Sequence, residues 1–154
     1  MISNMKSDVF YTPTAGTIKD VSLVPLNGEE IQTMSNIVLT FTPPHAIKGA
    51  SKITVKMPAK IEFSCILAYT TNLKAAPACT ELEPNVFQFD SPFLDDTFLG
   101  NQPVSIAFRN RELPASVEPI KGIEIATYQI VDNQPFLVDQ LIAPDLELFK
   151  MKAV

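Results

Sequence analysis

Apolar and polar residues alternate in short runs along this chain of 154 residues. A two-residue period is the pattern of a half-buried strand, whereas an amphipathic helix repeats its apolar residues every ~3.6 positions. Turn pairs such as Asn27-Gly28 and Pro43-Pro44 separate the runs. The strands expected from the pattern cover 18–26, 37–41, 53–57, 61–67, 86–89, 104–108, 123–128, 136–138 and 146–149.

Proline usage strengthens the prediction of strands. The chain has 13 prolines spread over its whole length, which leave few gaps for an uninterrupted helix. A helical turn has room only in 68–78 and 92–99. Short strands separated by turns favour a two-layer antiparallel sandwich over βαβ units, which need helices between their strands. The sequence therefore predicts an all-β protein.

Charge and residue counts exclude several functions. The net charge is −5, from 12 basic and 17 acidic residues, and no block of Lys and Arg is present, so we expect no nucleic-acid partner. A single histidine excludes metal sites that need two imidazoles from one chain. The five glycines lie too far apart for a phosphate-binding loop. No run of ~18 apolar residues is present to span a membrane. We expect no cofactor.

The remaining candidates for chemistry are one imidazole and two acidic pairs. His45 follows Pro43-Pro44 in a turn, and no nucleophile signature accompanies it, so we interpret it as an exposed loop histidine. Asp95-Asp96 and Glu29-Glu30 resemble parts of a calcium site but lack further acidic partners at ligand spacing. Calcium binding stays possible, although solvated turn charges are the favoured interpretation. We expect neither an enzyme nor a metal site.

Cys65 and Cys79 are the only two cysteines, 14 positions apart. In an oxidising compartment they could form a disulfide, which would stabilise the fold by ~3 kcal/mol in the chain-entropy picture. They could equally be two unrelated buried thiols that pack as small hydrophobes. The spacing alone does not decide between these two interpretations.

Several motifs follow one another in a fixed order from Gly16 onward. They are a Val-rich strand (18–25), a Thr/Phe strand ending at proline (39–43), a Lys-Ile-x-Val-x-Met-Pro strand (52–58), the two cysteines, an Ile-x-Phe strand (106–108), a Thr-Tyr strand (127–128) and a hairpin with aspartates (132–139). This order resembles the Ig-like repeats strung in tandem through very large secreted or surface proteins of ciliates and other protists. The chain departs from that pattern at 109–114, where it has a longer charged connection.

The resemblance implies an Ig-like antiparallel β-sandwich of about seven to nine strands over residues 16–140. Residues 1–15 would be an N-terminal flank, and 141–154 a C-terminal strand or linker. It also implies that Cys65 and Cys79 form a disulfide and that the protein is extracellular or at the cell surface. The expected function is a non-enzymatic structural or adhesive building block of a filament, coat or appendage, whose partners are copies of itself or tandem sister domains. The alternative is an extracellular ligand- or glycan-binding Ig-like module.

The last strand-like run has no place in a sandwich that is complete by Gln140. It could lie back on an edge of its own sandwich, or it could add to the sheet edge of a neighbouring subunit. Repeated head-to-tail contacts of the second kind would produce a filament. We predict that Leu146, Leu148 and Phe149 are assembly contacts of this type.

Overall fold

The computed structural model describes residues 15–27, 34–115 and 117–150. These residues form strands and a turn of 3-10 helix, so the predicted all-β class is confirmed. In chain order the strands are β1 (Gly16–Thr17), β2 (Lys19–Pro25), β3 (Met34–Thr42), β4 (Ile47–Lys48), β5 (Ser51–Lys56), β6 (Leu67–Thr71), β7 (Ala78–Glu83), β8 (Val86–Asp90), β9 (Thr97–Phe98), β10 (Val104–Glu112), β11 (Pro119–Val131) and β12 (Gln134–Lys150).

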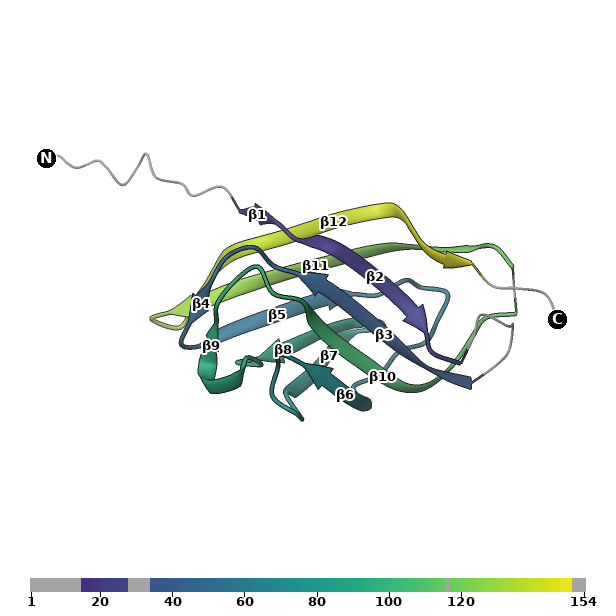
Figure 1. Ribbon diagram of the computed structural model, residues 1–154, viewed down its shortest axis with the longest axis horizontal. Coiled ribbons are helices and arrows are strands. Elements are labelled where there is room, and N and C mark those ends of the chain that lie inside the picture. The colour runs from purple at the N-terminus through teal and green to yellow at the C-terminus, as the bar shows by residue number, and fades with distance from the viewer. Residues whose placement is uncertain (1–14, 28–33, 116, 151–154) are drawn as a thin grey trace, which may run out of the picture.

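Two larger sheets account for most of the strands. The six-stranded sheet has the order β1-β12-β11-β5-β8-β7, and the four-stranded sheet has the order β2-β3-β10-β6. The short strands β4 and β9 pair separately. Figure 1 shows the four-stranded sheet lying across the six-stranded sheet. The first strand, β1, pairs with β12 in parallel. The other strand pairs in these sheets are antiparallel. This arrangement is consistent with the predicted sandwich.

The two sheets enclose one hydrophobic core. Strand alternation supplies it, because every second side chain of a strand points to the same face. Phe63 and Phe87 pack against Phe108 of β10, with ring centroids 5.1 and 5.9 Å away. All three rings are buried, and each contributes ~1.5–3 kcal/mol by leaving water. The phenylalanines at 41, 63, 87, 89 and 108 are therefore core residues, whereas Phe136 is exposed.

The segment 61–67 is not the strand that the sequence predicts. Ile61 and Phe63 are buried as the alternation requires, but the chain crosses here between the sheets and pairs only at its end, where the Ile66 carbonyl accepts from the Arg109 amide and Leu67 begins β6. The side chain of Asn85 takes the place of a partner strand. Its Oδ1 accepts a hydrogen bond from the Phe63 amide at 2.9 Å, and its Nδ2 donates to the Ile61 carbonyl at 2.6 Å. Alternate side chains are thus buried at Ile61 and Phe63 although no strand pairs with the backbone there.

The two segments with room for a helical turn have different outcomes. Residues 94–96 form a 3-10 turn, in agreement with the prediction for 92–99. Residues 68–78 instead contribute to β6 and the start of β7, which the sequence does not predict. Both are edge strands with largely half-buried or exposed side chains, so the hydrophobic pattern is weak in them.

The C-terminal boundary expected at Gln140 falls inside a strand. The runs 136–138 and 146–149 both belong to β12, which pairs with β11 from Gln134 to Lys150. Residues 141–154 are expected to be a C-terminal strand or linker, and as far as residue 150 they form a strand that completes the six-stranded sheet. The expected start of the domain coincides with β1 at Gly16, whereas residues 1–14 and 151–154 lie outside the described residues.

Candidate functional site

A buried carboxylate joins the first strand, the last strand and the β3–β4 connection. Asp139 of β12 has no exposed surface. Its Oδ2 accepts a hydrogen bond from the backbone amide of His45 at 3.0 Å, and its Oδ1 lies 2.7 Å from Nδ1 of the same histidine. Its own backbone amide donates to the buried hydroxyl of Thr127 at 3.2 Å. Both carboxylate oxygens are thus bonded, as a buried charge requires.

Gly16 lets the N-terminal strand lie directly on this carboxylate. In the parallel register Gly16 faces Asp139, and the Ile18 amide donates to the Gln140 carbonyl at 3.1 Å. A Cβ at Gly16 would overlap Oδ1 of Asp139 and would come within 2.6 Å of the His45 Nδ1. Only glycine leaves room for β1 at this distance. We call Gly16, His45, Thr127 and Asp139 the terminal junction.

The structure gives His45 a partner that the sequence does not reveal. Its side chain is 61% exposed, in agreement with the interpretation as a loop histidine. One ring nitrogen is nevertheless held by Asp139, which lies 94 positions away in the sequence. The aspartate–imidazole pair resembles two members of a catalytic triad, but among the described residues no hydroxyl or thiol bonds to the ring. The pair therefore ties chain segments together.

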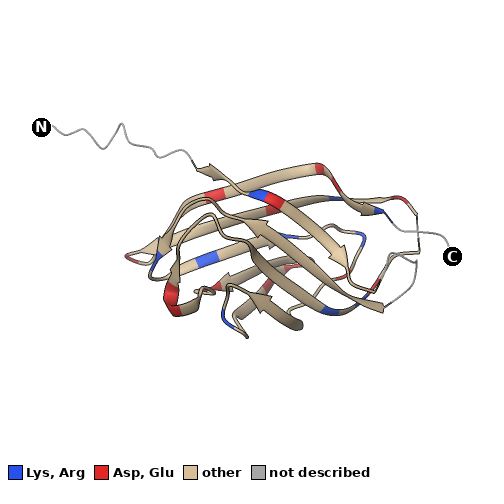
Figure 2. Ribbon diagram, in the orientation of Figure 1, with Lys and Arg blue, Asp and Glu red and all other residues tan. Residues whose placement is uncertain are grey.

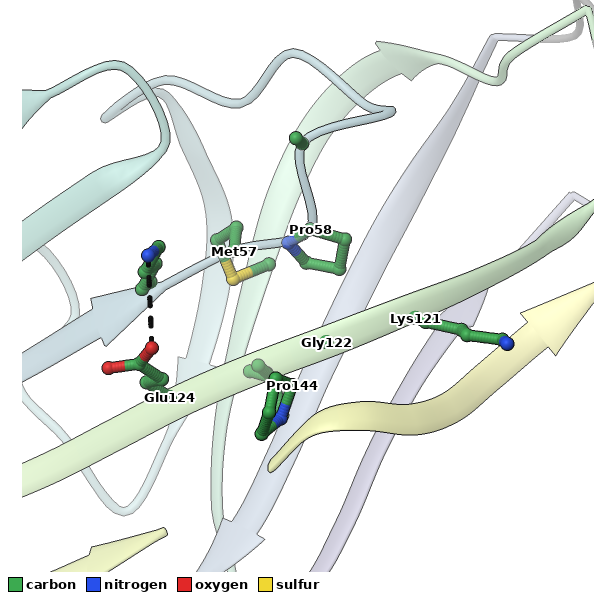
Figure 3. Close-up of a pocket in the computed structure, with 9 residues that line it drawn as sticks. Met57, Pro58, Lys121, Gly122, Glu124 and Pro144 are labelled. Atoms are coloured by element: carbon green, nitrogen blue, oxygen red, sulfur yellow. Dashed lines mark ion pairs between the residues drawn. The ribbon is translucent and has the colours of Figure 1, made fainter. Parts of the chain in front are cut away.

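A second candidate site is a pocket where β12 bulges away from β11. Lys121 pairs with Glu147 and Ile123 pairs with Ala143, so β12 advances four residues while β11 advances two. Gly122 lies opposite the bulge with φ +92°, and a Cβ there would come within 2.9 Å of the Pro144 carbonyl oxygen. Figure 3 shows Gly122 and Pro144 beside the pocket, with Met57 and Pro58 behind them.

This pocket holds about 200 Å³ and has mainly apolar walls. Its volume is below the ~300–1,000 Å³ of typical ligand sites. Lys56 at its margin is paired with Glu124 at 3.8 Å, as Figure 3 marks. We interpret the pocket as a consequence of the bulge, because the irregular pairing separates the two strands at this point.

The two cysteines form a disulfide, as the resemblance implies. The Cys65–Cys79 bond joins Cα atoms 5.8 Å apart. Cys65 lies just before β6, an edge of the four-stranded sheet, and Cys79 lies in β7, an edge of the six-stranded sheet. The bond therefore links the two sheets along one side of the sandwich, and it closes a 14-residue separation worth ~3 kcal/mol.

The predicted assembly contacts need correction. Phe149 is only 7% exposed and belongs to the core of its own chain, and Leu148 packs against that core. The reason is that β12 pairs with β11 as far as Lys150, so the final residues are covered without a second subunit. Leu146 is 38% exposed, and its role in assembly stays a prediction.

The acidic pairs have no metal-binding geometry in the part of the chain that the structure describes. No group of three or more His, Cys, Asp or Glu side chains that could hold an ion is present there. Asp96 instead pairs with Lys74 at 3.2 Å, and Glu29-Glu30 lie outside the described residues. Within the same ranges, no helix has the length and apolar character needed to span a bilayer.

Comparison with known proteins gives no family assignment. No protein-family model and no curated protein matches the chain. Among solved structures, the chain is similar to a crystal structure described as BslA, a bacterial hydrophobin, with a TM-score of 0.44 and 15% sequence identity. The alignment covers 85% of this chain and 96% of that chain. A likeness this distant identifies neither a fold nor a function.

Proposed function

We propose that this protein is a non-enzymatic, Ig-like structural unit of an extracellular filament, surface coat or appendage, and that it transmits tension between its two ends. The observation that carries the proposal is the parallel pairing of β1 with β12 at the terminal junction. β1 begins toward the end of the molecule that holds β4, β9 and the β11–β12 turn, whereas β12 finishes toward the opposite end (Figure 1).

The topology supports the Ig-like assignment. The N-terminal run contributes β1 to one sheet and, after Ile18, β2 to the other. An N-terminal run that serves both sheets closes the sandwich along one side. On the opposite side the disulfide links β7 to the segment before β6. Both open sides of the sandwich are thus fastened by contacts between residues far apart in the sequence.

Parallel terminal strands resist tension by shear. Force that pulls β1 toward its N-terminus and β12 toward its C-terminus acts along both strands and across the hydrogen bonds that join them. All the bonds of the junction must then yield together. The Asp139–His45 contact adds a third chain segment to the same point, because His45 belongs to the β3–β4 connection. We infer that the junction is the element that limits mechanical unfolding.

Exposed apolar side chains at both ends support assembly through the ends. Leu26 and Met34 are 51% exposed where β2 ends and β3 begins. Val131 and Phe136 are 48% and 55% exposed around the β11–β12 turn at the other end. Two different apolar surfaces at opposite ends favour heterologous, head-to-tail contacts, which give open chains when the rotation does not close. The disulfide favours an oxidising, extracellular location.

Stretching a concatenated array of the chain by its ends tests the mechanical role. We expect a clear force peak for each copy and a lower peak for Asp139→Asn. The matched control is Phe89→Leu in β8, a core change away from the junction. If the two variants lose the same unfolding free energy, Phe89→Leu should still unfold at a higher force than Asp139→Asn. Unfolding without a force peak, or equal force losses in both variants, would contradict the proposal.

Electron microscopy of the purified chain tests assembly. We expect end-to-end chains that shorten in Phe136→Ser, because this change removes an exposed apolar group at one end. Tyr69→Ser is the control, since Tyr69 is 44% exposed in β6, on the side of the sandwich. Isolated particles at every concentration would argue against an assembly function.

A further inference from the structure

The outer face of the six-stranded sheet carries a row of uncharged side chains that crosses five strands. Gln140 of β12 faces Ala126 of β11, which faces Thr54 of β5. Thr54 in turn faces Gln88 of β8, and Gln88 faces Thr80 of β7. These residues alternate along β5, β8 and β11 with buried core residues, so they point away from the core. We call the five residues the polar row.

A hollow of about 330 Å³ lies over the β12 side of the polar row. Ala126 lines the hollow, and its methyl group is much smaller than the side chains of Glu124 and Tyr128 on either side of it along β11. Ile142 adds an apolar wall on β12. The volume lies at the small end of the ~300–1,000 Å³ that ligand sites usually occupy.

Three charged residues line the hollow: Lys56 and Glu124 pair with each other, and the exposed Glu83 of β7 adds a negative charge at the far side. Lys56 Nζ lies 3.8 Å from Glu124 Oε2 on one side of the row. On the other side, Lys52 Nζ lies 5.1 Å from the centre of the Tyr128 ring, and Lys52 faces Asp90 in the register. The floor between these pairs is neutral. It therefore matches an uncharged ligand better than an anion, which the net charge of −5 would also repel.

Two polar side chains of the row are available to a ligand, whereas Gln88 donates to Asp90. Within the described part of the chain, the side chains of Gln140 and Thr54 make no hydrogen bond to protein. An amide offers two donors and an acceptor, and a hydroxyl offers one donor and acceptor lone pairs. Exposed groups of this kind bond to water in the free protein, so a ligand must offer equivalent hydroxyls in order to replace that water.

The outer face of the other sheet differs in this respect. Thr40 of β3 and Ser105 of β10 lie 3.0 Å apart and bond to each other through their hydroxyls. The next row across that sheet is apolar, with Val24 beside Val38. Figure 2 shows that β3 and β6 carry no charged residue. The neighbouring strands of that sheet are charged, since β2 carries Lys19 and Asp20 and β10 carries Arg109, Arg111 and Glu112.

We propose that the polar row binds one chain of an uncharged polysaccharide, laid across the strands with its centre over Ala126. Five strands at ~4.8 Å spacing give a track of ~19 Å, which is long enough for several sugar units. Sugar hydroxyls both donate and accept, as the amide and hydroxyls of Gln140 and Thr54 do, and their C–H faces suit Tyr128 and Ile142. This binding goes beyond the mechanical role and would attach the protein to a surrounding glycan without using its ends.

The first test adds uncharged hexasaccharides to the full chain and follows backbone amide shifts by NMR. The probes are the β-1,4-glucan, β-1,3-glucan and β-1,4-mannan hexamers, and the galacturonic acid hexamer is the charged control. We expect at least one neutral hexamer to bind, with shifts concentrated in β12, β11 and β5. The proposal is overturned if no neutral hexamer binds, if the charged hexamer binds as well, or if the shifts map elsewhere.

Two variants test the position of the site. Ala126→Arg fills the hollow and should weaken binding by at least about tenfold, and Gln140→Ala should weaken it by about threefold. Ser22→Arg is the matched control, because it adds the same charge on exposed β2 of the other sheet, and it should bind as the unchanged chain does. Thermal unfolding verifies that each variant folds. Equal binding by Ala126→Arg and Ser22→Arg overturns the proposal. The proposal is also overturned if the chain forms a dimer without saccharide and Ala126→Arg dissociates that dimer, because the polar row would then bind a second copy of the chain.

Discussion

The two halves of β12 protect the same sheet edge in different ways. Near Asp139 the edge is covered by β1, which pairs with two residues and is fixed by the terminal junction. Beyond Gln140 no described strand pairs with that edge, and the chain instead has Pro144 and a bulge opposite Gly122. Proline removes a backbone donor and a bulge bends the strand, so both discourage pairing with another chain. The edge is thus covered by a contact at Asp139 and Gln140, and it is protected by an irregularity around Pro144.

This difference predicts that the first half is far more sensitive to substitution. The junction packs a carboxylate, an imidazole and a backbone strand without spare room. The second half already tolerates irregular pairing and a pocket of about 200 Å³. Substitutions in the two halves therefore measure whether stability is concentrated where β1 meets β12.

Gly16→Val should have the largest effect. The added side chain overlaps Asp139 and His45, so β1 must leave β12 or the buried pair must break. Removing the donors of a buried carboxylate is costly, so we expect a loss of unfolding free energy of about 4 kcal/mol. Urea unfolding measures it, and hydrogen exchange of the Ile18 amide reports the detachment of β1. Thr17→Ala, at the adjacent exposed position, is the control. A loss below about 1 kcal/mol would contradict the tight packing.

Asp139→Asn should cost about 3 kcal/mol. Asparagine keeps the shape but is uncharged and has one carbonyl oxygen, so it loses the charged acceptor, and its amide group meets Nδ1 of His45 favourably only if the ring changes tautomer. The same unfolding measurement applies. The comparison with Gln140→Asn, one residue further along β12, separates the loss of the acceptor from any general effect on the strand. Equal losses at both positions would mean that the junction has no special role.

The sequence predicts the core and the strands better than the junction. Alternation identifies the buried aromatic residues of β3, β8 and β10, because burial acts locally on every second residue. The Asp139–His45 contact spans 94 positions, and each residue alone resembles a solvated polar group. The first part of the run 61–67 is misread as a strand for a related reason, since the partner of Ile61 and Phe63 is the single side chain of Asn85. Long-range polar contacts leave no periodic pattern in a sequence.

Phe149→Ala should cost about 2 to 3 kcal/mol, at or below the low end of the range for a buried aromatic ring. Phe149 faces Ile120 across the β11–β12 ladder, and it retains 7% exposure. Urea unfolding of the monomer decides between its two roles. A loss of stability in dilute monomer shows that the residue belongs to its own core. A loss that appears only in assembled material would restore it as a contact between subunits.

His45→Ala should cost about 1 kcal/mol, which is more than an ordinary exposed loop residue and less than Asp139→Asn. The change removes the ring bond to Asp139 but leaves the backbone amide bond to the second oxygen. The side chain is 61% exposed, so water can replace part of the lost contact. Ala46→Ser, at the adjacent exposed position, is the control for the loop. A change within about 0.5 kcal/mol would show that the imidazole contributes nothing to the junction.

Leu146→Ser should have the smallest effect on folding, within about 0.5 kcal/mol, because the side chain is 38% exposed in the bulged half of β12. Its effect on assembly is a separate question. If Leu146 contacts a neighbouring subunit, the serine variant will unfold like the unchanged chain yet form shorter chains in the electron microscope. Glu147→Ser, at the next position and also exposed, is the control for the loss of a large side chain. Chains of unchanged length in both variants would remove Leu146 from the contact surface, and would leave the bulge as protection of the sheet edge alone.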